Sequence, residues 1–277
     1  MRELNRERDI EPTSKWLNRV QWVFIGSIVF SLAGSLFLRL FPATGQFFGP
    51  YYETLVKAPT WTYMSLLPLI PILMYRRQLG ARTLGILFGI GAIIGGLSEF
   101  IGTTTGYPFG TYAYTAWLGP KLAGHVPYFI PLSWFAMSVV SFDLAGRIAR
   151  TATSQILLGA AFMVLWDVSL DPAMSRAFPF WYYPDGGFFY GMPLINWFGW
   201  YVVSIVIMSG YAITLGGTRL IHSNAGLFYA LNCAFPLMLS LIYGLEGAFV
   251  IGVVATTVPF ILSSLRKRNP VLERAAQ

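Results

Sequence analysis

The chain has 277 residues, of which 55% are hydrophobic, 17% aromatic and only 11% charged. This composition is typical of a polytopic membrane protein and excludes an ordinary soluble domain. The formal net charge of +7 does not indicate a nucleic-acid partner, because the positive residues fall in short segments between apolar stretches.

Eight apolar stretches are long enough to cross, or nearly cross, a hydrocarbon core about 30 Å thick, which takes about 20 helical residues. They cover residues 22–41, 60–75, 83–102, 127–146, 154–171, 193–215, 224–244 and 247–265. The second is short and contains Pro68 and Pro71, so we expect it to be kinked, tilted or incompletely spanning. The sequence therefore predicts an all-α fold, a polytopic transmembrane helical bundle with about eight spans.

The distribution of Lys and Arg predicts the orientation of these spans. With alternate loops assigned to opposite sides, 15 of the 19 basic residues fall on the side that carries both termini. By the positive-inside rule that side is cytoplasmic. We expect a cytoplasmic surface segment over 1–20, a transmembrane helical domain over 21–266 and a cytoplasmic tail over 267–277.

The third span is rich in glycine. The pairs Gly85/Gly89 and Gly91/Gly95 have the small-xxx-small spacing that lets helices approach closely. The alternative explanation is that these glycines leave room for a bulky ligand.

The predicted outer connections, 42–59, 103–126 and 172–192, are long and mix Tyr, Trp and Phe with Gly and Pro. Aromatic residues gather at membrane interfaces, which explains part of this composition. Loops longer than about 15 residues are also often functional lids. Both interpretations stay open from sequence alone.

Carboxylic acids within apolar stretches are the strongest functional signal, because a bilayer makes them costly and they usually face a cavity or a partner. Glu99 lies near the outer end of the third span, and Asp167 and Asp171 lie near the outer end of the fifth. The i, i+4 spacing places both aspartates on one helical face. Two negative charges there would repel, so we expect at least one to hold a proton that it could donate while an ionised neighbour accepts one. A hydrogen-bonded structural network is the alternative.

Other polar residues have weaker claims. Asp143 lies four residues before Arg147, and a local ion pair explains it. His125 could join the acids or be a solvated loop residue, and Asn196 could orient a water molecule or cap a helix. With two His and one Cys in the chain, we expect no metal site and no cofactor.

Four segments resemble the membrane carotenoid biosynthesis proteins of the CruF type. They read GGLSEFIGTTTGYPFGTYAYT (95–115), LGPKLAGHVPYFIPLSWFAM (118–137), LWDVSLDPAM (165–174) and YGMPLINWFGWY (190–201). The resemblance implies a carotenoid 1′,2′-hydratase that adds water to the terminal double bond of an acyclic ψ-end group without oxygen or a redox cofactor. Lycopene, γ-carotene or a related carotenoid would be the substrate in the bilayer of a prokaryotic cytoplasmic membrane, and a carotenoid glycosyltransferase is a candidate partner.

Our hypothesis is that Asp167 or Asp171 protonates C2′ and that Glu99 positions the attacking water. The opposite assignment of these two roles is the alternative. The tertiary cation at C1′ would be stabilised by nearby aromatic faces, each by about 0.5–2 kcal/mol, and a carboxylate would take the proton of the water. Candidate substrate contacts, besides His125 and Asn196, are Trp134, Trp166, Tyr190 and Trp197. The alternatives are a non-catalytic carotenoid-binding or lipid-binding protein, a pathway scaffold, and a proton-coupled transporter.

Overall fold

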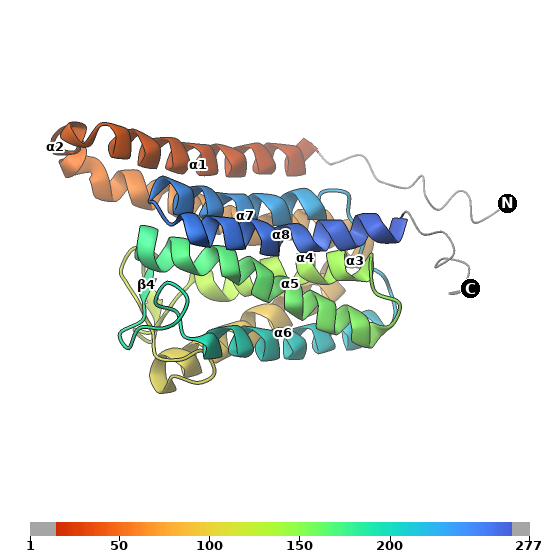
Figure 1. Ribbon diagram of the computed structural model, residues 1–277. Helices are drawn as coiled ribbons and strands as arrows, with labels where there is room; N and C mark the ends of the chain where they lie inside the picture. Colours follow the sequence, from red (N-terminus) through yellow and green to blue (C-terminus); the bar gives the residue numbers. More distant parts are fainter. Residues whose placement is uncertain (1–14, 268–277) are drawn as a thin grey trace.

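The computed structural model describes residues 15–267 and contains a bundle of long helices (Figure 1). They are α1 (Lys15–Leu40), α3 (Tyr52–Thr105), α4 (Phe129–Gly146), α5 (Ala152–Pro172), α6 (Leu194–Leu215), α7 (Ala225–Ile242) and α8 (Glu246–Lys267). Within residues 15–267, seven helical segments are long and apolar enough to cross a membrane. The prediction of an all-α transmembrane bundle is confirmed.

The count of seven rather than eight arises in α3, which joins the second and third predicted spans into one element of 54 residues. Its backbone leaves helical geometry at Gly80, with φ 70° and ψ 168°. A side chain would be strained at this positive φ, so glycine allows the chain to reverse. The break in α3 therefore lies at Gly80, after the short span, and the kink or tilt expected of that span from Pro68 and Pro71 stays a prediction.

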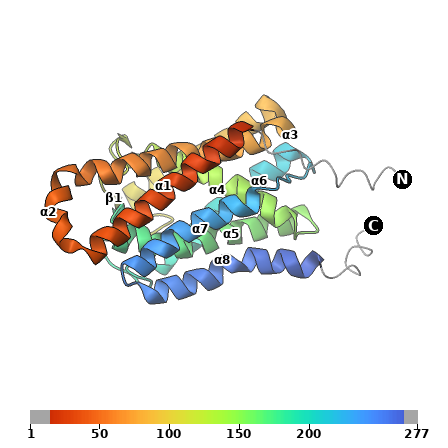
Figure 2. The same cartoon turned by 90° about the horizontal axis from the view of Figure 1, so that it is seen from above.

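The first half of α3 and α1 form an antiparallel pair at the edge of the bundle (Figure 2). They are joined by the short turns η1 (Pro42–Thr44), α2 (Gly45–Phe48) and η2 (Gly49–Tyr51). Helix α1 begins and α8 ends at the same end of the bundle (Figure 1), as an even number of crossings requires. Which side of the membrane this end faces stays a prediction, and most of the predicted surface segment and tail lies outside the described residues.

Helix α4 occupies the centre. Its composition is apolar all round, as expected of a helix without a lipid-facing side, and 15 of its 18 residues are buried. The outer helices α1 and α8 instead expose large apolar side chains such as Trp22 and Val254. This contrast fits a bundle whose rim faces lipid.

Glycines in the second half of α3 allow α4 to pack against it. A Cβ added at Gly95 would lie 2.4 Å from the ring of Trp134, and one at Gly91 would lie 2.8 Å from Cα of Phe135. The close approach predicted for this pair is confirmed. The prediction of a close helix approach is wrong for Gly85 and Gly89, because an added Cβ would meet no neighbouring helix at either position.

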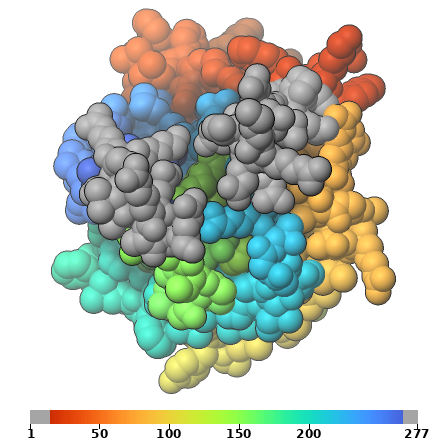
Figure 3. Space-filling view, turned by 90° about the vertical axis from the view of Figure 1, so that its right-hand side faces the viewer, coloured from red at the N-terminus to blue at the C-terminus, as the bar shows by residue number. Residues whose placement is uncertain are grey.

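The α3–α4 and α5–α6 connections meet at the end of the bundle opposite the start of α1. Strand β1 (Ala113–Tyr114) pairs with β4 (Trp181–Tyr182), and β2 (Lys121–Leu122) pairs with β3 (Val126–Pro127), both antiparallel. A π-helical turn, η3 (Ala173–Ala177), leads from α5 into β4. At the other end, the α4–α5 and α6–α7 connections lie side by side (Figure 3) and are joined by a hydrogen bond from Arg147 to the carbonyl oxygen of His222.

Candidate active site

Glu99 is buried near the C-terminal end of α3 and is surrounded by hydrogen-bond donors. Its Oε1 accepts a hydrogen bond of 2.8 Å from Nε1 of Trp134 on α4. Its Oε2 accepts one of 2.8 Å from the hydroxyl of Tyr114 and another from the hydroxyl of Tyr112. Three donors to one carboxyl group solvate a negative charge well, in place of the water that burial removes.

Asp171 and Asp167 lie one turn apart at the end of α5, and each is only 1% exposed. Asp171 accepts hydrogen bonds from Nε1 of Trp181 at 2.6 Å and from the hydroxyl of Tyr183 at 2.8 Å. Nδ2 of Asn196 donates to Oδ2 of Asp167 at 3.0 Å and lies 3.4 Å from Oδ2 of Asp171. The predicted placement of the two aspartates on one face is confirmed. Asp167 differs in that Asn196 is its one hydrogen-bond donor among the described residues.

A small cavity of about 40 Å³ lies against both aspartates. This is large enough for water, since a site needs roughly 10–15 Å³ to hold a water molecule. The three donors to Glu99 also line it, whereas Glu99 itself does not and contacts the cavity only through them. Its lining residues are Tyr112, Tyr114, Ile130, Ser133, Trp134, Trp166, Asp167, Leu170, Asp171, Trp181, Tyr183, Asn196 and Trp200.

Aromatic side chains form most of the cavity wall. Trp134 stacks on Trp200 with ring centroids 4.3 Å apart, and Trp166 meets Trp200 edge-on at 5.7 Å. On the other side, the rings of Tyr112 and Tyr183 lie 6.1 Å apart. Such faces attract a cation that forms nearby.

The pairing of β1 with β4 brings the tyrosine and tryptophan donors over the acids. Tyr114 lies opposite Trp181 in this register. Side chains alternate along a strand, so Trp181 and Tyr183 turn inward while Tyr182 is 50% exposed. The two long aromatic connections therefore cover the acids, as the lid interpretation expects. Tyr107 and Phe188, which are 74% and 81% exposed, fit the interfacial interpretation.

The loop tyrosines stay protonated in this setting. Burial raises the pKa of Tyr112, Tyr114 and Tyr183 well above its ordinary value, and the nearby carboxyl groups of Glu99 or Asp171 raise it further. Each phenol is therefore held as a donor toward a carboxylate.

Several residues predicted from the sequence line this cavity, namely Trp134, Trp166 and Asn196. Others do not. His125 lies half-buried with its ring 5.4 Å from that of Phe100, and Trp197 and Tyr190 pack against Phe189. The sequence analysis missed Tyr112, Tyr114, Trp181, Tyr183 and Trp200, although the aromatic composition of the outer connections was a signal for the first four.

Asp143 belongs to a separate network at the opposite end of the bundle. It accepts hydrogen bonds from Nε of Arg147 at 2.8 Å, from the hydroxyl of Tyr75 at 2.7 Å and from the backbone N–H of His222 at 2.9 Å. The predicted ion pair with Arg147 is confirmed. This network ties α4 to α3 and to the α6–α7 connection.

Comparison with known proteins identifies the class. Residues 60–259, most of the chain, match the family described as carotenoid biosynthesis protein. The chain belongs to this family of membrane proteins, as the resemblance implied.

A particular relative is the bisanhydrobacterioruberin hydratase of Haloarcula japonica, which is 32% identical over 191 residues. The match covers 64% of this chain and 60% of the relative, so the chain spans less than two thirds of that protein's length. No solved structure matches the chain.

Proposed function

We propose that this protein is a carotenoid hydratase that adds water across the terminal 1′,2′ double bond of an acyclic ψ-end group. The product would be a tertiary 1′-hydroxy carotenoid. The observation that carries the proposal is a small cavity lined by the buried Asp167 and Asp171 under an aromatic cover, with the buried Glu99 hydrogen-bonded to three of the lining side chains. Membership of a carotenoid biosynthesis family and similarity to a protein named as a hydratase support it.

Asp167 is the proposed general acid. Glu99 accepts hydrogen bonds from three donors, and Asp171 accepts them from Trp181, Tyr183 and Asn196. Asp167 has a single donor within the part of the chain that the structure describes. A carboxyl group in such surroundings readily keeps its proton and can deliver it to C2′ of the alkene. The positive charge then forms at C1′, where three carbon substituents stabilise it.

The cation lies against the faces of Trp134, Trp166 and Trp200 in this proposal, each of which contributes about 0.5–2 kcal/mol. Water from the cavity attacks C1′, and Asp171 or Glu99 takes the released proton as a general base. One proton enters the carotenoid and one leaves the water, so the net change is the addition of one water molecule. The proton returns from the base to Asp167 through the cavity water before the next turnover.

The substrate would be lycopene, γ-carotene or a related carotenoid in the cytoplasmic membrane of a prokaryote. A carotenoid glycosyltransferase that modifies the new hydroxyl is a candidate partner. Expression in a bacterium that makes lycopene tests the proposal. A new pigment heavier by about 18 mass units, the mass of water, is expected from the wild type and from Asp185→Asn, whose side chain is exposed in the α5–α6 connection. Unchanged lycopene that purifies with the folded protein would instead support a non-catalytic carotenoid-binding protein.

A further inference from the structure

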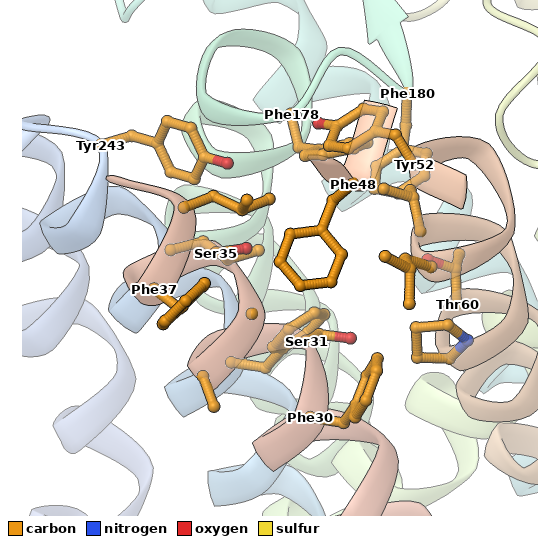
Figure 4. A pocket seen from close by; sticks show the side chains of 18 residues that line it. Phe30, Ser31, Ser35, Phe37, Phe48, Tyr52, Thr60, Phe178, Phe180 and Tyr243 are labelled. Carbon is orange, nitrogen blue, oxygen red and sulfur yellow. The ribbon is translucent and has the colours of Figure 1, made fainter. Parts of the chain in front are cut away.

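A second and much larger pocket lies beside the acid site. It has a volume of about 440 Å³ and lies between α1, the first half of α3, α7 and the segment that follows η3 (Figure 4). Phe48 points into it from the α2 turn, and Phe178 and Phe180 close one wall (Figure 4). Every lining side chain is uncharged. This volume is typical of a small-molecule site.

Only a thin wall separates the pocket from the acids. Phe180 lines the pocket, and the next residue, Trp181, lines the acid cavity and donates to Asp171. Successive side chains point to opposite faces of an extended strand. The same strand therefore places Phe180 in the pocket wall and Trp181 in the wall of the acid cavity. The backbone carbonyl oxygen of Phe180 is held by the N–H of Thr115 at 2.9 Å, which fixes this wall to the β1 connection.

The pocket also opens toward lipid. Phe30 and Phe37 on α1 are 53% and 42% exposed and form its outer edge. A long apolar molecule dissolved in the bilayer can therefore enter sideways between α1 and α3. The acid cavity of about 40 Å³ is too small for a branched alkene end together with water, so the end must displace side chains to arrive there. The apolar pocket is the adjoining space from which it can do so.

We propose that the pocket binds the polyene chain of the carotenoid substrate next to its reacting end. This inference rests on the proposed function for the identity of the ligand. Phenylalanine rings match the flat face of a polyene, and the uncharged lining offers nothing to a phospholipid headgroup. A pocket of about 440 Å³ holds only part of such a chain, so the remainder extends into lipid.

Two glycines of α1 provide a matched test. A Cβ added at Gly34 or at Gly26 would meet no atom within 4 Å, but only Gly34 lines the pocket. Gly34→Trp should therefore fill the pocket without disturbing the helix, and Gly26→Trp places the same ring on the lipid side of the same helix. Val56→Phe fills the pocket from its α3 wall. This second variant keeps the test valid if Gly34→Trp does not fold.

The measurement is lycopene retained per mole of purified protein, together with co-purified phospholipid and the yield of hydrated product. We expect Gly34→Trp and Val56→Phe to retain about tenfold less lycopene than the wild type, as overfilling a site predicts, and Gly26→Trp to match the wild type. Equal lycopene retention in Gly34→Trp, or a loss of phospholipid alone, would overturn the inference.

The same experiment separates this inference from the proposed function. If the wild type retains lycopene without hydrating it and the pocket variants lose it, the pocket assignment stands and the hydratase proposal fails. If the wild type and both pocket variants hydrate lycopene equally, the hydratase proposal stands and the pocket assignment fails.

Discussion

Asn196 donates a hydrogen bond of 3.0 Å from its side-chain amide to Oδ2 of Asp167, and the same nitrogen lies 3.4 Å from Oδ2 of Asp171. One residue of α6 therefore fixes both aspartates of α5. We expect Asn196→Ala to lower hydration by about 100-fold, because small displacements of reacting groups can cost that much. The product yield at equal protein level measures this effect. Asn224→Ala is the control, since Asn224 bonds to Gln21 instead, and equal losses in both variants would contradict the assignment.

Asp167→Asn should reduce hydration by about 10²–10⁴-fold, the usual contribution of a general acid, since an amide cannot deliver the proton. Asp185→Asn removes an exposed carboxyl group from the α5–α6 connection and should leave the yield unchanged. The check is product per mole of folded protein in isolated membranes. Turnover of Asp167→Asn at the wild-type rate would exclude Asp167 as the acid.

The cover over Glu99 can be tested with Tyr114→Phe, which removes one donor to the carboxyl group and little else. A hydrogen bond to a charged group contributes about 1.5–3 kcal/mol, so we expect a loss of roughly 10–100-fold in hydration. Tyr182→Phe is the matched control on the facing strand, because Tyr182 is 50% exposed and turns away from the cavity. A larger loss in Tyr182→Phe would count against this part of the site.

Alkaline titration tests the state of the loop phenols. Because the folded-state pKa of Tyr112, Tyr114 and Tyr183 is raised, their contribution to stability is fully present below the unfolded pKa of about 10 and is lost as the pH rises beyond it. At pH 10 these three phenols should still be protonated in the wild type. A variant with Phe at all three positions should therefore show as many tyrosinates as the wild type by ultraviolet absorbance. Fewer tyrosinates in the folded triple variant would mean that these phenols ionise normally.

The role of Asp143 is predicted to be structural. Asp143→Ala leaves Arg147 and a buried hydrogen-bond network without its acceptor, and losing one partner of a buried pair costs about 3–5 kcal/mol. Glu53→Ala breaks a pair in which Glu53 is 69% exposed and should cost about 0–1 kcal/mol. Thermal unfolding in detergent distinguishes the two. A proton-coupled transport role would instead predict loss of function in Asp143→Ala at unchanged stability.

The parts of this molecule that hydropathy and local spacing control could be predicted from the sequence. The spans, the shared face of Asp167 and Asp171 and the pair of Asp143 with Arg147 depend on neighbours within one or two helical turns. The inward turn of Tyr114 and Trp181 could not, because it depends on the pairing of β1 with β4, which are far apart in the sequence. His125 and Trp197 do not line the cavity, because their rings pack against Phe100 and Phe189.

The most direct test of hydration is the source of the oxygen atom in the product. The protein is expressed with lycopene and supplied in parallel with isotope-labelled water and with labelled O₂. The proposed mechanism predicts one labelled oxygen atom from water and none from O₂, because the hydroxyl comes from the water that attacks C1′. A hydroxyl labelled from O₂ would contradict the acid–base mechanism at Asp167, Asp171 and Glu99.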